Sequence, residues 1–374
     1  MKKILLGTTA LIGAATLFAG AAHAEGPAVS LGGFIDFQAG FVDQDNVYET
    51  GANSRDVKFQ NDTKVDVKVD GKSDNGLGYG AVIQLQADVT GDADNGGLNA
   101  DRTYVYLESN LGRVELGSQV SPAKTMRVDA SNFSHGTGGV DGDFYDFVNV
   151  GGVGTGAFII SPDLPLDAGL RGGANSTENA SKIVYYTPRF SGFQGGVSYA
   201  PDSGNRGTAA GFTTDADPQD AENVFDLGIN YTGQFDQVGV AASATGSFGS
   251  AEAAATEDLR AFALGLNVSY MGFTAGGSYG DWDDSLQATA ASGDASFWDV
   301  GLGYETGPFG VSVSYFDSEL NDNDFNNFVI GADYKLAPGL VPYVEVNFFE
   351  LDPAAAGVPS NDGTAVLAGT QLNF

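Results

Sequence analysis

The chain has 374 residues and a formal net charge of −31 at pH 7. A surface this acidic repels nucleic acid, which excludes a nucleic-acid-binding protein. The chain has no cysteine, which excludes a disulfide-held fold, and its 25 phenylalanines and 15 tyrosines argue against disorder.

The first predicted element is a secretory signal peptide. A basic start, Met1–Lys3, precedes an apolar stretch of small residues and the cleavage-type tripeptide Ala22–Ala24. We therefore expect residues 1–24 to be removed and residues 25–374 to form one exported domain. No later segment has the ~20 consecutive apolar residues that a membrane-spanning helix needs.

The rest of the chain predicts an all-β fold of sixteen strands. The clearest strand is 58–70, where valines alternate with charged residues of both signs. It exceeds the ~9–11 residues that a membrane-spanning strand needs, and an even number of strands suits a closed antiparallel transmembrane barrel. The predicted strands are 28–42, 56–70, 77–90, 101–109, 113–120, 181–190, 193–201, 223–233, 238–249, 259–270, 273–282, 296–304, 309–317, 326–336, 340–350 and 363–374.

The connections between these strands alternate in length. Glycine, with 54 residues, clusters with Asp and Asn at intervals that predict many turns. Short turns at one rim and long loops at the other are the layout of an outer-membrane barrel, with short periplasmic turns and long extracellular loops. The long loops are 43–55, 91–100, 121–180, 202–222, 250–258, 283–295, 318–325 and 351–362. A loop as long as 121–180 is usually functional.

Aromatic residues flank the short turns, as at Phe190 and Phe193 and at Tyr270 and Phe273. Rings at one common level are typical of an interfacial girdle, and ordinary cross-strand pairing in hairpins is the alternative. The chain also ends in a strand with period-2 alternation up to Phe374. A paired terminal strand favours a closed barrel, although the last strand of a soluble sandwich would look similar.

Two segments resemble the Gram-negative general-diffusion porins, in particular the alphaproteobacterial, Rhodobacter-like type. Residues 102–123 are similar to the strand–turn–strand unit before the family's third loop, although Ser118 stands where a basic residue is common. Residues 181–193 are similar to the hairpin that follows that loop. The resemblance implies a 16-stranded barrel in the outer membrane of a Gram-negative bacterium, a homotrimer, an inward-folded third loop at 121–180, and Phe374 as an assembly signal.

The alternation of the early strands directs basic side chains into the lumen, opposite an acidic third loop. Charges of opposite sign across a narrow aqueous gap create a transverse field that disfavours apolar solutes. Acidic loops also predict a mild preference for cations, damped because the Debye length is ~8 Å in physiological salt. Solvated charges without a shared constriction are the alternative. The candidate constriction residues are Lys58, Lys64, Arg102, Arg113, Asp129, Asp141, Asp143 and Asp146.

Three of these acidic residues are also weak candidates for a structural Ca²⁺ site, since hard cations take oxygen ligands. Asp141, Asp143 and Asp146 do not have EF-hand spacing, so solvated carboxylates are the favoured interpretation and no other cofactor is expected. Catalysis is not expected either. His135 is the only histidine outside the signal peptide, and no cysteine nucleophile exists.

The combined interpretation is an outer-membrane porin that contacts lipid and passes small hydrophilic solutes and ions down their gradients. The alternatives are a substrate-selective channel, a structural or adhesive surface barrel with a plugged lumen, and a secreted soluble β-protein.

Overall fold

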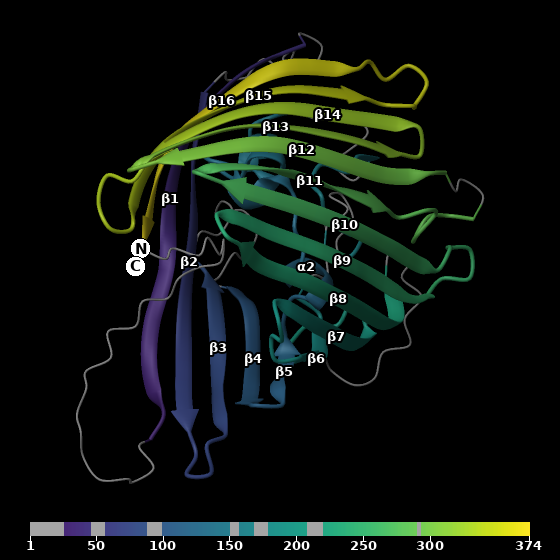
Figure 1. Ribbon diagram of the computed structural model, residues 1–374. Helices are drawn as coiled ribbons and strands as arrows, with labels where there is room; N and C mark the ends of the chain where they lie inside the picture. The colour runs from purple at the N-terminus through teal and green to yellow at the C-terminus, as the bar shows by residue number, and fades with distance from the viewer. Residues whose placement is uncertain are drawn as a thin grey trace.

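The computed structural model describes residues 26–45, 57–87, 99–149, 157–167, 179–207, 220–289 and 293–374. The predicted signal peptide lies outside these residues. Sixteen antiparallel strands form a closed barrel in which each strand pairs with its neighbours in sequence and β1 pairs with β16 (Figure 1). This confirms the predicted fold. Among the described residues, no helix is long and apolar enough to cross a membrane.

The strands agree closely with the prediction. They are β1 (Ala28–Gln44), β2 (Val57–Lys72), β3 (Gly78–Gln86), β4 (Asn99–Ser109), β5 (Gly112–Ser118), β6 (Ser181–Tyr186), β7 (Phe193–Asp202), β8 (Ala221–Phe235), β9 (Val238–Ala251), β10 (Leu259–Tyr270), β11 (Phe273–Asp281), β12 (Ala295–Thr306), β13 (Phe309–Leu320), β14 (Asn323–Tyr334), β15 (Leu340–Asp352) and β16 (Asn361–Asn373). Between β5 and β6, the described residues include four short helices: α2 (Pro122–Thr125), η1 (Ala130–Phe133), η2 (Gly139–Asp141) and η3 (Asp143–Asp146).

Two boundaries differ from the prediction for clear reasons. β6 ends at Tyr186 instead of residue 190, because Pro188 lacks the N–H that would continue the ladder. The predicted long loop 318–325 is wrong. β13 and β14 meet in a two-residue turn in which Asn321 and Asp322 both have positive φ, at 54° and 62°. Two left-handed residues match the right-handed twist of the strands, and Asn and Asp tolerate that conformation.

The last residue of the chain takes part in closing the barrel. The N–H of Phe374 donates to the carbonyl of Gly33 and the N–H of Gly33 donates to the carbonyl of Phe374, both at 3.1 Å. The two ends of the described chain therefore lie close together (Figure 1). The ring of Phe374 stays 57% exposed on the outside of the barrel. The terminal strand is thus paired to its end, as a closed barrel requires.

The outer face of the barrel is apolar and carries aromatic pairs at the rim with the short turns. Neighbouring strands pair Phe193 with Tyr231 and Phe309 with Tyr334, and both pairs of ring centroids are 4.8 Å apart. All four rings face outward with substantial exposure. Both pairs join strands that are connected at the opposite rim, so they are not pairs across the short turns. The interfacial girdle stays a prediction. Such a rim suits the headgroup layer of a membrane.

Candidate pore constriction

Residues 121–149 and 157–167 of the long loop lie inside the barrel. We call these residues the inner segment. Figure 1 shows α2 within the ring of strands. Along the inner segment, α2 contacts β7, β8 and β9, η1 contacts β11 to β13, η2 contacts β13 and β14, and η3 contacts β16. The inner segment therefore follows the inner wall in chain order across more than half of the barrel.

Inward-facing side chains of the wall bond the backbone of the inner segment. Most of them are fully or almost fully buried. Because a buried peptide group without a partner is costly, these bonds fix where the segment runs. The bonds are Val128 N to Ser243 Oγ (2.9 Å), Asn267 Nδ2 to Asp129 O (2.9 Å), Ala130 N to Asp299 Oδ1 (2.7 Å), His135 N to Ser312 Oγ (2.9 Å) and Thr137 N to Glu345 Oε2 (2.9 Å).

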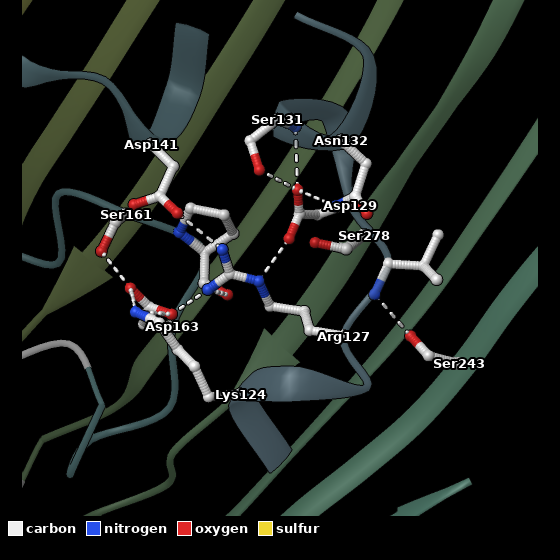
Figure 2. A network of polar contacts seen from close by, with 12 residues as sticks. Lys124, Arg127, Asp129, Ser131, Asn132, Asp141, Ser161, Asp163, Ser243 and Ser278 are labelled. Carbon is white, nitrogen blue, oxygen red and sulfur yellow. Dashed lines mark hydrogen bonds and ion pairs between the residues drawn. The ribbon is translucent and has the colours of Figure 1, made fainter. Parts of the chain in front are cut away.

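A single guanidinium gathers three carboxylates of the inner segment, and we call Arg127, Asp129, Asp141 and Asp163 the arginine cluster (Figure 2). Arg127 forms ion pairs with Asp129 and Asp163, and its Nη2 lies 2.6 Å from Asp141 Oδ2. Lys124 adds a second cation 2.9 Å from Asp163. The cluster joins parts of the segment that are up to 36 residues apart in sequence.

The arginine cluster is held together by charge in a buried place. Burial by itself lowers the pKa of Arg127, but the charges of Asp129 and Asp141 outweigh it and raise the pKa above its usual range. Burial likewise raises the pKa of Asp129, yet Arg127 and hydrogen bonds from Ser131 and Asn132 bring it below its usual value. Arginine and aspartate therefore stay charged together at neutral pH.

The predicted acidic residues fall into two groups. Asp129, which is fully buried, and Asp141 belong to the arginine cluster. Asp143 and Asp146 instead face β1 and β2: Gln38 Nε2 lies 2.5 Å from Asp143 Oδ2, and Gln60 Nε2 lies 3.2 Å from Asp146 Oδ2. In the described part of the chain, no three Asp, Glu or His residues are placed to hold a metal ion.

Of the predicted basic residues, Lys58 contacts the inner segment, whereas the other three bond to residues outside it. Its Nζ lies 2.7 Å from Asp146 O and 5.2 Å from the centre of the Phe147 ring. Lys64 pairs with Asp101 at 3.2 Å, and Arg102 Nε donates to Gln84 Oε1 at 3.0 Å. Arg113 pairs with Glu108 and Glu115 on the wall.

Comparison with known proteins decides the class. The Gram-negative porin family matches residues 7–354. The chain belongs to this family. An uncharacterized protein of Rickettsia bellii (strain RML369-C) is 26% identical to this porin over all of both chains. An outer membrane porin protein of Bordetella pertussis is 29% identical over 54% of this porin and 48% of its own length.

Solved structures share the fold of this porin. The anion-selective porin from Comamonas acidovorans has a TM-score of 0.63, and a triple mutant of the Rhodopseudomonas blastica porin has a TM-score of 0.60. Both are 17% identical and cover 93% of this chain and 100% of their own. Porins are outer-membrane channels and not enzymes, so family membership confirms the predicted location and class.

Sequence reasoning missed the residues that hold the porin's inner segment. Arg127 carried a signal, because it is a basic residue two positions before Asp129 in an acid-rich loop. Glu345 carried another, because it is an acidic residue on the lumen-facing side of a predicted strand. Ser243 and Ser312 carried none, since small polar residues are ordinary on an inward face.

Proposed function

We propose that this porin is a passive, water-filled pore for small hydrophilic solutes and ions, of the alphaproteobacterial, Rhodobacter-like type. The observation that supports the proposal is the inner segment, which contacts the wall from β7 to β16 and reaches β1 and β2 at Asp143 and Asp146. A loop fixed against one side of a barrel narrows the lumen and leaves passage along the other side. Lys64, Arg102 and Arg113 lie on that other side.

A mild preference for cations follows from the charges near η3. Gln38 bonds both Asp36 and Asp143. The negative charges of Asp146, Asp62 and Glu345 lie close enough to repel that of Asp143. Lys58 is the cation bonded at this place. By contrast, Arg127 and Lys124 balance two of the three negative charges of Asp129, Asp141 and Asp163. An excess of carboxylates beside a narrow aqueous passage raises the local concentration of cations.

General diffusion is favoured over a substrate-selective channel. A selective site for sugars would present aromatic faces to the lumen. Tyr106 points inward but is only 5% exposed, and the Arg113 guanidinium lies 3.8 Å from its ring centre. The covered ring face leaves no stacking platform at this position.

Planar bilayers test the proposal directly. We expect stepwise conductance in the nanosiemens range, and a reversal potential in a KCl gradient whose sign shows mild preference for K⁺. The absence of steps from folded protein would favour a plugged structural barrel instead. The homotrimer is tested separately by the mass of the detergent-solubilised complex.

The preference for cations should also depend on pH through Asp143. Burial raises the pKa of Asp143 to about 7, with further contributions from Asp146, Asp62 and Glu345. Below that pH the carboxyl takes up a proton and the passage loses one negative charge, and above it the charge returns. We therefore expect the preference for K⁺, measured as reversal potential, to increase from pH 6 to pH 8 with a midpoint near 7.

Asp143→Asn should remove that step. The matched control is Asp236→Asn, on the exposed turn between β8 and β9, where Asp236 has a φ of 55° that asparagine also tolerates. This control should keep the wild-type pH profile. An unchanged profile in Asp143→Asn would assign the pH dependence to another group.

A further inference from the structure

Two residues of the inner segment sit on the barrel wall in the same way. Val128 and His135 are seven positions apart and both are buried. The N–H of Val128 donates to Ser243 Oγ on β9, and the N–H of His135 donates to Ser312 Oγ on β13, each at 2.9 Å. Each serine therefore holds one peptide group of the segment.

The direct cross-strand neighbour of each serine is a glycine. Ser243 pairs with Gly265 of β10, and Ser312 pairs with Gly331 of β14. A Cβ atom on Gly265 would lie 1.6 Å from the carbonyl oxygen of Val128. A Cβ atom on Gly331 would likewise lie 1.6 Å from the carbonyl oxygen of His135. Val128 and His135 thus each donate their N–H to a serine, while their C=O lies against the glycine next to that serine.

Close approach, and not backbone conformation, explains these glycines. Neither Gly265 nor Gly331 has a positive φ, so any residue could adopt its backbone angles. A glycine inside a strand weakens the strand, and such positions often mark close approach of another backbone. Between the two pairs, Gly301 and Gly303 lie under Phe133 of η1, where an added Cβ would be 3.0 Å from the ring.

We propose that the pairs Ser243–Gly265 and Ser312–Gly331 are positioning residues that set the distance between the inner segment and the wall. The inference rests on the proposed function, because that distance then sets the cross-section of the pore. The serine prevents the segment from moving away, and the glycine allows it to come close. One added methyl group would push the segment toward the lumen by roughly 2 Å to reach ordinary van der Waals contact.

Spin labels measure this distance without relying on conduction. The chain has no cysteine, so two introduced cysteines give one defined pair of labels. Asn132 is an exposed residue of η1, between the two serine–glycine pairs, and Lys68 lies on the inward face of β2. We expect Gly265→Ala and Gly331→Ala each to change the Asn132–Lys68 label distance by roughly 2 Å and to lower single-channel conductance by at least about a fifth.

Two further sets of variants keep the test decisive. The double variant Ser243→Ala with Ser312→Ala adds no atoms, so it should fold more readily than the two glycine variants. It removes both bonds to the segment, so we expect a broader distribution of the Asn132–Lys68 label distance. Gly195→Ala on β7 is the control, because its nearest neighbour would be 3.6 Å from the new Cβ, and it should change neither distance nor conductance.

The outcomes separate this inference from the proposed function. Label distances that match the Gly195→Ala control in both alanine variants would overturn it, as would an unbroadened distribution in the double serine variant. A shifted distance without a change of conductance in a conducting porin would also overturn it. If the wild-type protein does not conduct, the proposed pore fails, and the distances alone decide whether these pairs position the segment.

Discussion

Arg127→Met is expected to lower the free energy of unfolding by about 3–5 kcal/mol, because it leaves buried carboxylates without their cation. The side chains of Asp129 and Asp163 are 0% and 4% exposed, so water cannot replace the guanidinium. Methionine keeps much of the length of the side chain and removes only the charge and the donors. Urea titration of the detergent-solubilised porin at one protein concentration measures the loss.

An exposed ion pair provides the matched control for Arg127→Met. Lys335 and Glu305 pair at 2.9 Å, and the Lys335 side chain is 52% exposed. Lys335→Met should therefore lower the free energy of unfolding by less than about 1 kcal/mol. Neutralising the partners, with Asn at Asp129, Asp141 and Asp163 in the Arg127→Met background, should recover part of the lost stability. Equal losses in the two methionine variants would show that the arginine cluster is not a buried charge network.

The pH dependence of the Arg127→Met effect has a definite sign. Arg127 and the hydrogen bonds to Asp129 hold the pKa of Asp129 below its ordinary value of 3.8. A carboxyl with a depressed folded pKa contributes stability that is present above the unfolded pKa and is lost as the pH falls through the folded value. In Arg127→Met the burial that raises the pKa of Asp129 is no longer opposed by a cation, so this carboxyl takes up its proton at a higher pH than in wild type. The difference between wild type and Arg127→Met should therefore shrink as the pH falls from the raised pKa of the variant to the depressed pKa of wild type.

The barrel itself was readable from the sequence because its signals are local. Period-2 alternation over 58–70 and in the terminal strand reports directly which face of each strand is apolar. The errors arose where one or two residues override the pattern. Pro188 ends β6 early, and the left-handed pair Asn321–Asp322 replaces a predicted loop by a tight turn.

The site was less readable because it depends on contacts between residues far apart in sequence. Asp129 was predicted in the pore constriction, and the structure places it in the arginine cluster, where Arg127, two residues away, pairs with it. Gly265 and Gly331 were predicted inside strands and lie there, but the sequence does not show that each is under a segment more than 100 residues away in the chain. Only the register between strands shows that each lies beside a serine.

Phe144→Ala is expected to lower the free energy of unfolding by about 3–5 kcal/mol, because it leaves a cavity at the centre of an apolar core inside the barrel. Phe144 of η3 is 2% exposed, and its ring centroid lies 5.9 Å from that of Phe325 and 6.0 Å from that of Phe349. These wall phenylalanines point inward, where a water-filled barrel would otherwise have polar residues. Their apolar faces therefore need the inner segment as a cover.

The decisive measurement for Phe144→Ala is where the lost stability appears. If the core only seats the inner segment, amide hydrogen exchange should accelerate in residues 143–149 while strands β12 to β16 stay protected. Phe248→Ala is the control, because Phe248 is 44% exposed on the outer face, where detergent or lipid fills the space left by the ring. It should leave exchange in 143–149 unchanged. Equal exchange in both variants would mean that the polar bonds and the arginine cluster alone hold the segment. The inward phenylalanines would then stabilise only the strands of the wall.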